Sequence, residues 1–72
     1  MQIHVNGEPR EVAGDTSLAD LVSILKLPDE RIAVELNHLV VRRSDWPGTL
    51  LREDDRVEIV HFVGGGVFGF DN

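Results

Sequence analysis

The stretch at residues 56–66 constrains the fold most, because a strand pattern there runs directly into three consecutive glycines. Val57 and Ile59 alternate with Glu58, which is the period-two pattern of a strand with one buried face. The glycines at 64–66 lack Cβ atoms, so this part of the chain can enter a narrow channel and approach another molecule closely. A strand anchored in a sheet and ending in such an arm could present a main-chain carboxylate to an enzyme. A flexible tail or linker is the alternative interpretation of the same glycines.

Composition restricts the chain to one small domain with little room for a catalytic cavity. The sequence has 72 residues, no cysteine and a formal net charge of −6. Without cysteine there is no disulfide, thiolate nucleophile or cysteine-ligated metal. The negative charge argues against nucleic-acid binding and suits docking on basic protein surfaces. We see neither a signal peptide nor an apolar run that could span a membrane, and we expect a cytoplasmic protein.

Short strand patterns surround one helical pattern. Asn6-Gly7 is a strong hairpin signal between strands expected at residues 2–5 and 8–13. Pro9 lacks an N–H group, which places the second of these strands at or near a sheet edge.

A helix is expected over about residues 17–26. Asp15 or Thr16 could cap it, and Ser17 with Asp20 offers a capping box one residue later. Four aliphatic residues at helical spacing form one apolar stripe: Leu18, Leu21, Val22 and Leu25.

Further strands are expected at residues 32–36, 39–41 and 56–63, with Trp46 filling one edge of the core. One helix stripe needs one sheet face to cover it. We therefore predict an α+β fold, a mixed sheet over one main helix, with the first and last strands central and parallel. This is the β-grasp, or ubiquitin-like, architecture. The predicted sheet face that meets the helix consists of Ile3, Val5, Val34, Val57 and Ile59.

The polar residues do not suggest catalysis or a metal site. His4 and His61 could be neighbours if the first and last strands pair, but two ligands do not close a zinc site. Asp54 and Asp55 are adjacent carboxylates that a turn before a strand explains better than acid–base chemistry. We expect no catalytic side chain, no bound cofactor and no metal.

The residues beside the arm are candidates for partner docking. Phe62 and Val63 are neighbours on a strand and cannot face the same side, so at least one should be exposed. An exposed aromatic residue is a common docking anchor. Val60 and His61 complete the predicted docking segment, and Leu39 could extend it.

Several segments resemble ThiS, the ubiquitin-like sulfur carrier family of thiamine thiazole biosynthesis, which is related to the MoaD family. The resemblance covers residues 1–66 and is most specific in the last strand and the arm; arginine replaces a family proline at Arg42. The segments that carry it are residues 1–6, 16–22, 33–37, 41–46 and 54–66.

This resemblance implies that the chain is a protein cosubstrate and not an enzyme. The site would be the carboxylate of Gly66, presented by Gly65 and Gly64. A ThiF-like adenylyltransferase would activate it with ATP, and a cysteine desulfurase or rhodanese-type donor would supply sulfur. Thiazole synthase (ThiG) would use the resulting thiocarboxylate.

Residues 67–72 depart from the family pattern, whose members usually stop at the second or third glycine. We therefore divide the chain into a carrier domain at residues 1–66, with its arm at 64–66, and an extension that is removed or disordered. A JAMM-type protease could remove it. Three alternatives stay open: a MoaD-like small subunit of molybdopterin synthase, a carrier for another sulfur-containing metabolite, and a β-grasp interaction module without carrier activity.

Overall fold

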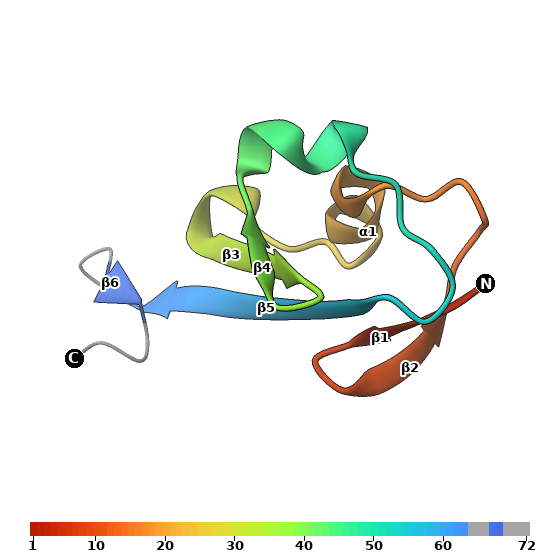
Figure 1. Ribbon diagram of the computed structural model, residues 1–72. Helices are drawn as coiled ribbons and strands as arrows, with labels where there is room; N and C mark the ends of the chain where they lie inside the picture. The colour runs from red at the N-terminus through yellow and green to blue at the C-terminus, as the bar shows by residue number, and fades with distance from the viewer. Residues whose placement is uncertain (64–66, 69–72) are drawn as a thin grey trace.

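One mixed sheet and one helix make up most of the computed structural model, which describes residues 1–63 and 67–68 (Figure 1). The strands that form the row β2-β1-β5-β3-β4 are β1 (Gln2–Val5), β2 (Glu8–Glu11), β3 (Ile32–Leu36), β4 (Leu39–Val41) and β5 (Arg56–Val63). A further strand, β6 (Val67–Phe68), pairs with β5 outside this row. The helix α1 (Leu18–Ile24) lies over one face of the sheet. Two 3-10 helices follow it: η1 (Asp29–Arg31) lies between α1 and β3, and η2 (Arg43–Gly48) lies between β4 and β5.

The predicted topology is confirmed. β1 runs parallel to β5, and β5 runs antiparallel to β3, so β1 and β5, which come first and last in the chain among the strands of the row, lie side by side within it, with β5 at its centre. β2 forms the edge that Pro9 indicated, although it ends at Glu11, earlier than expected. The mixed sheet over one helix is the α+β, β-grasp arrangement.

The helix begins at the predicted capping box but ends early. The Asp20 N–H group donates to the Ser17 hydroxyl at 3.0 Å, and the Ser17 N–H group donates to the Asp20 carboxylate at 3.1 Å. At the other end Lys26 has a left-handed φ of 57°. The N–H groups of Lys26 and Leu27 bond back to the carbonyls of Ser23 and Val22, which is the Schellman motif that stops a helix. No helix in the described parts of the chain is long and apolar enough to cross a membrane.

The core lies between α1 and the inner faces of the three central strands. Leu18, Leu21 and Val22 are buried as predicted, whereas Leu25 and Val5 are only partly buried at its margin. The buried apolar residues are Ile3, Val12, Leu18, Leu21, Val22, Ile32, Val34, Trp46, Leu51, Val57 and Ile59. Trp46 fills one edge of this core, as expected, and its Nε1–H group donates to the Val41 carbonyl at 2.9 Å.

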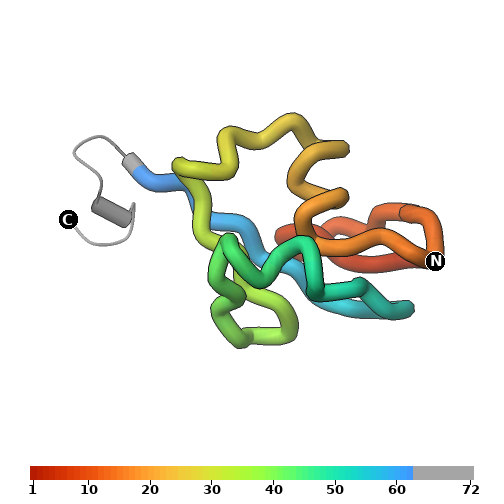
Figure 2. The backbone as a smooth tube through the Cα atoms, turned by 90° about the horizontal axis from the view of Figure 1, so that it is seen from above, coloured from red at the N-terminus to blue at the C-terminus, as the bar shows by residue number. Residues whose placement is uncertain are grey.

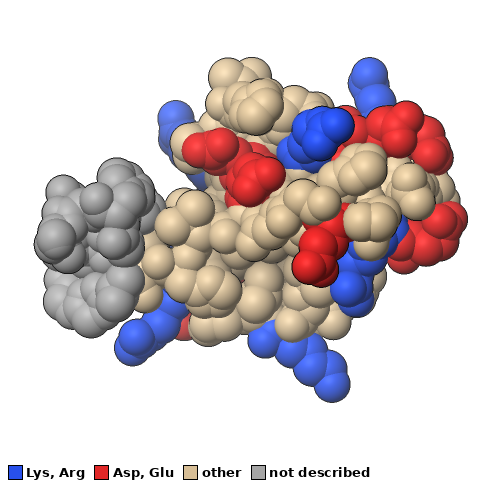
Figure 3. All heavy atoms as spheres, turned by 90° about the horizontal axis from the view of Figure 1, so that it is seen from below, with Lys and Arg blue, Asp and Glu red and all other residues tan. Residues whose placement is uncertain are grey.

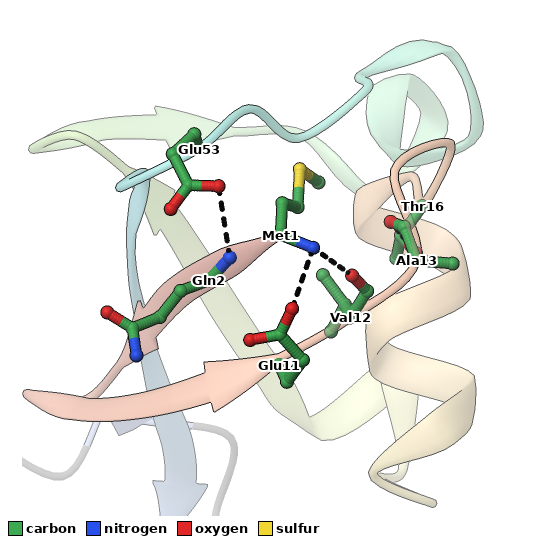
Figure 4. A network of polar contacts seen from close by, with 7 residues as sticks. All are labelled: Met1, Gln2, Glu11, Val12, Ala13, Thr16 and Glu53. Carbon is green, nitrogen blue, oxygen red and sulfur yellow. Dashed lines mark hydrogen bonds and ion pairs between the residues drawn. The ribbon is translucent and has the colours of Figure 1, made fainter.

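Polar contacts tie the start of β1 to neighbouring segments (Figure 4). The amino group of Met1 donates to the Val12 carbonyl at 2.7 Å and pairs with the Glu11 carboxylate at 2.9 Å. The Gln2 N–H group donates to the Glu53 carboxylate at 3.2 Å. These contacts lie at the end of the molecule opposite to the end at which β5 leaves the sheet (Figure 2).

Candidate docking surface and C-terminal arm

β5 directly precedes the glycines in the sequence and is anchored in the middle of the sheet. It pairs with β1 at Val5↔Val57 and with β3 from Leu36↔Val57 to Ile32↔His61. Val57 is fully buried, and Ile59 is 8% exposed. In Figure 1, β5 runs below the helix and continues past the rest of the sheet. The strand before the glycines therefore has a fixed position and direction.

The predicted adenylation site, Gly66 with Gly65 and Gly64, lies outside the described residues and stays a prediction. Beyond it, β6 pairs antiparallel with β5, with Phe62 opposite Phe68 and Val63 opposite Val67. The proposed removal of residues 67–72 is likewise untested by this geometry.

The face of the sheet turned away from α1, here called the outer face, carries both apolar and acidic residues. Glu58, Val60 and Phe62 alternate with the buried Val57 and Ile59, so their side chains point to the outer face. Across the strands, Val60 lies opposite Ala33, and Glu58 lies opposite Glu35, which in turn lies opposite Val40. Figure 3 looks onto this face: uncharged surface occupies much of its middle, and most Lys and Arg side chains project from its margins.

Two glutamates lie opposite each other across β3 and β5 on this surface. Glu35 and Glu58 are direct cross-strand neighbours and are both half-buried. Within the described residues neither forms an ion pair, although Arg56 lies on the same strand and face as Glu58. Like charges placed directly opposite each other destabilise a sheet. A positively charged group on a partner would relieve that repulsion.

The structure separates the residues of the predicted docking segment. Val60 and half-buried Phe62 lie on the outer face, whereas the exposed His61 lies opposite Ile32, on the side that faces the helix layer. Leu39 is 72% exposed but lies opposite Leu36 and does not extend the outer face. Val63 is the last residue of β5.

Sequence reasoning missed Ala33, Glu35, Val40 and Glu58 as members of this surface. Each lies in a strand that was expected, but the surface they form exists only in the register of β5 with β3 and of β3 with β4. Alternation within each strand predicts which face of the sheet a side chain lies on. Only the register of β3 with β5 shows that the two glutamates lie opposite each other. Asn6 was read only as a turn residue, and the bonds of Asn6 and Asn37 to β5 were not anticipated.

The histidines and aspartates behave as structural residues. β1 and β5 do pair, but His4 lies opposite Arg56 and His61 lies further along β5, so the two histidines are not neighbours. The Asp55 carboxylate accepts the Arg52 N–H group at 2.8 Å, as expected of a turn aspartate. In residues 1–63 and 67–68, no group of three His, Asp or Glu side chains could hold a metal ion.

Comparison with known proteins gives consistent matches. A family model described as the ThiS family matches residues 3–66. The sulfur carrier protein ThiS of Bacillus subtilis (strain 168) is 32% identical over 65 residues, covering 89% of this chain and 98% of that protein. The crystal structure of a thiamine biosynthesis protein (ThiS) from Geobacter metallireducens matches with a TM-score of 0.80 and 38% identity, covering 92% of this chain and 100% of that chain.

A longer relative also matches. A protein of Magnetococcus marinus named thiazole synthase is 46% identical over 66 residues, which cover 92% of this chain but only 20% of that protein. The chain thus spans about a fifth of the length of this relative. Part of a thiazole synthase polypeptide therefore resembles this domain.

Proposed function

The chain belongs to the ThiS family, and on that premise we propose that it is a sulfur carrier for the thiazole ring of thiamine. The observation that carries the proposal is the position at which the family match ends. The match reaches Gly66, the last of the three glycines that follow β5. A carboxylate at that position would stand at the end of a thin arm on a firmly anchored strand.

The first step would be activation of the Gly66 carboxylate by a ThiF-like adenylyltransferase. A carboxylate oxygen attacks the α-phosphorus of ATP, the bond to the β-phosphate breaks, and pyrophosphate leaves. The product is an acyl-adenylate, a mixed anhydride from which AMP departs readily. The carrier supplies the carboxylate and no catalytic side chain, so it is a cosubstrate.

The second step would replace AMP with sulfur. A persulfide on a cysteine desulfurase or rhodanese-type donor attacks the acyl carbon and displaces AMP. A thiol then cleaves the sulfur–sulfur bond, which leaves a thiocarboxylate on Gly66 and a disulfide on the other product. Thiazole synthase would take sulfur from this thiocarboxylate. The similarity to a longer thiazole synthase supports this choice of acceptor.

Activation requires that residues 67–72 be removed first. A peptide bond at Gly66 offers no free carboxylate, and a JAMM-type protease is the proposed processing enzyme. Removal would also release the main-chain pairing of β6 with Phe62 and Val63. Processing would therefore change both the chain end and the last part of β5.

The outer face is the proposed docking surface for the adenylyltransferase and for thiazole synthase. It offers Val60 and Phe62 as apolar anchors beside the arm, and the Glu35–Glu58 pair as an element that attracts a basic group. The chain as a whole carries a formal charge of −6. A partner surface with an apolar centre and basic residues would complement both properties.

The intact mass of the protein isolated from its native cells tests this function. We expect a chain that ends at Gly66, together with a heavier form in which one oxygen has been exchanged for sulfur. Cells that lack the adenylyltransferase are the matched control and should contain only the oxygen form. A chain that always extends to Asn72 and never carries the extra sulfur would rule the proposal out.

A further inference from the structure

Asn6 extends the pairing of β1 with β5 beyond the end of the β1 main chain. Main-chain pairing of the two strands ends at Val5↔Val57. The chain then turns towards β2, with φ of 50° at Asn6 and 84° at Gly7. The Asn6 side chain accepts the Ile59 N–H group on Oδ1 at 2.7 Å and donates from Nδ2 to the Ile59 carbonyl at 3.2 Å. Its carboxamide thus takes the place of the next peptide group of a strand.

These bonds act on β5 directly before the segment that leads to the glycines. The Asn6 N–H group adds a third bond, to the Val57 carbonyl at 2.8 Å. On its other side β5 is held by β3, which pairs with it as far as His61. Ile59 is therefore held from both sides; Val60 and His61 still pair with β3, and residues 62–63 continue beyond the last of these pairs.

Asn37 provides a natural comparison at the start of β5. It also has a left-handed φ, of 51°, and its Oδ1 accepts the Arg56 N–H group at 2.9 Å. Its Nδ2 donates to the Asp55 carboxylate at 3.0 Å. Two asparagines with a left-handed φ thus hold β5, Asn37 at Arg56 and Asn6 at Ile59.

We propose that Asn6 is a positioning residue for the C-terminal arm, an inference that rests on the proposed function. By holding Ile59, its carboxamide helps to fix the part of β5 from which residues 62–63 leave the pairing with β3, and so the direction in which they leave it. That direction decides where the Gly66 carboxylate reaches the α-phosphate of ATP in the activating enzyme. Reacting atoms must approach to about 3–3.5 Å, and a misplacement of about 1 Å can cost roughly a hundredfold in rate.

The test replaces each asparagine with glycine. Asn6→Gly keeps a residue that tolerates the left-handed turn and removes the side chain that carries the carboxamide. Asn37→Gly makes the same change at the start of β5 and is the matched control. Asn6→Asp is a second variant, which retains the acceptor for the Ile59 N–H group and loses the donor to the Ile59 carbonyl.

The first readout is amide exchange and backbone order by NMR in the full-length chain. In Asn6→Gly we expect exchange of the Ile59 amide to quicken by about tenfold, as the loss of a net hydrogen bond implies. Order parameters of residues 60–63 should fall. Asn37→Gly should affect the Arg56 amide and leave residues 60–63 unchanged, and Asn6→Asp should lie between wild type and Asn6→Gly.

The second readout is adenylation of proteins that end at Gly66. A shorter chain of this kind is expected to fold, because 92% of this chain matches the whole of the Geobacter crystal-structure chain. For Asn6→Gly we expect kcat to fall by roughly tenfold while KM changes little, because the docking surface is intact. Asn37→Gly should keep the wild-type kcat.

Unchanged order parameters in Asn6→Gly, or in Asn6→Asp if the glycine variant does not fold, would overturn the inference. So would a kcat for Asn6→Gly equal to that of Asn37→Gly. Absence of adenylation in the wild type would reject the proposed function instead. In that case the order parameters decide alone: a loosened segment at residues 60–63 supports the role of Asn6, and an unchanged segment rejects it.

Discussion

Glu35 and Glu58 lie directly opposite each other on β3 and β5, with no cation paired to either within the described residues. The pair lies beside Val60 on the surface that we propose for docking. A cross-strand pair of like charges costs stability, so its presence fits a role outside the isolated fold.

Glu58→Gln should therefore stabilise the fold and weaken partner binding at the same time. Relief of the repulsion should raise the free energy of unfolding by about 0.2–1 kcal/mol. Urea denaturation measures the first effect, and calorimetric titration with the adenylyltransferase measures the second. Glu8→Gln removes the same charge from an exposed position on β2 and should change neither. Unaltered binding by Glu58→Gln would exclude the glutamate pair from docking.

Phe62→Ala should raise KM for the adenylyltransferase, because an aromatic side chain on the outer face is a typical anchor. The domain should stay folded, since Phe62 is only half-buried. Binding should weaken as the salt concentration rises, because exposed charges are screened. Leu50→Ala is the control, because Leu50 is 61% exposed and lies outside the docking surface. If Phe62→Ala has the same kinetics as the control, and binding does not depend on the salt concentration, the outer face is not the docking surface.

Leu21→Ala should destabilise the domain by about 2–5 kcal/mol, because it opens a cavity at a fully buried position. Urea denaturation provides the measurement. Ile24→Ala on the same helix is the control, since Ile24 is 51% exposed and its loss should cost much less. Equal midpoints for the two variants would show that the core face of α1 is assigned wrongly.

Lys26→Gly should stabilise the chain by about 0.5–1 kcal/mol. Lys26 occupies the left-handed position of the Schellman motif, where a Cβ atom costs energy that glycine avoids. Lys26→Ala removes the same charge but keeps the Cβ atom, so it should bring no gain. Thermal unfolding of the two variants distinguishes these outcomes, and a lower midpoint for glycine than for alanine would contradict the strain argument.

Local patterns in the sequence predicted the elements and the core well. The stripe of Leu18, Leu21 and Val22 and the alternation of Val57 with Ile59 each depend on neighbours along the chain, and both are confirmed. The capping box of Ser17 and Asp20 is local in the same sense.

Features that depend on strand register could not be read in this way. The separation of His4 from His61 and the meeting of Glu35 with Glu58 follow from which residues the strands pair. The early end of α1 was missed because Lys26 occupies a left-handed position that usually carries glycine. Asn6 was read as a turn residue, and its bonds to Ile59 become visible only once β1 and β5 lie side by side.

The central claim is that Gly66 becomes the reacting carboxylate once residues 67–72 are gone. Exchange of labelled pyrophosphate into ATP, catalysed by a cognate adenylyltransferase, measures this most directly. Two proteins are compared, one ending at Gly66 and one running to Asn72 with its full mass verified. We expect pyrophosphate exchange with the shorter protein and none with the longer one until a protease trims it. Equal exchange with the intact longer protein, or no exchange with the shorter one, would contradict the claim.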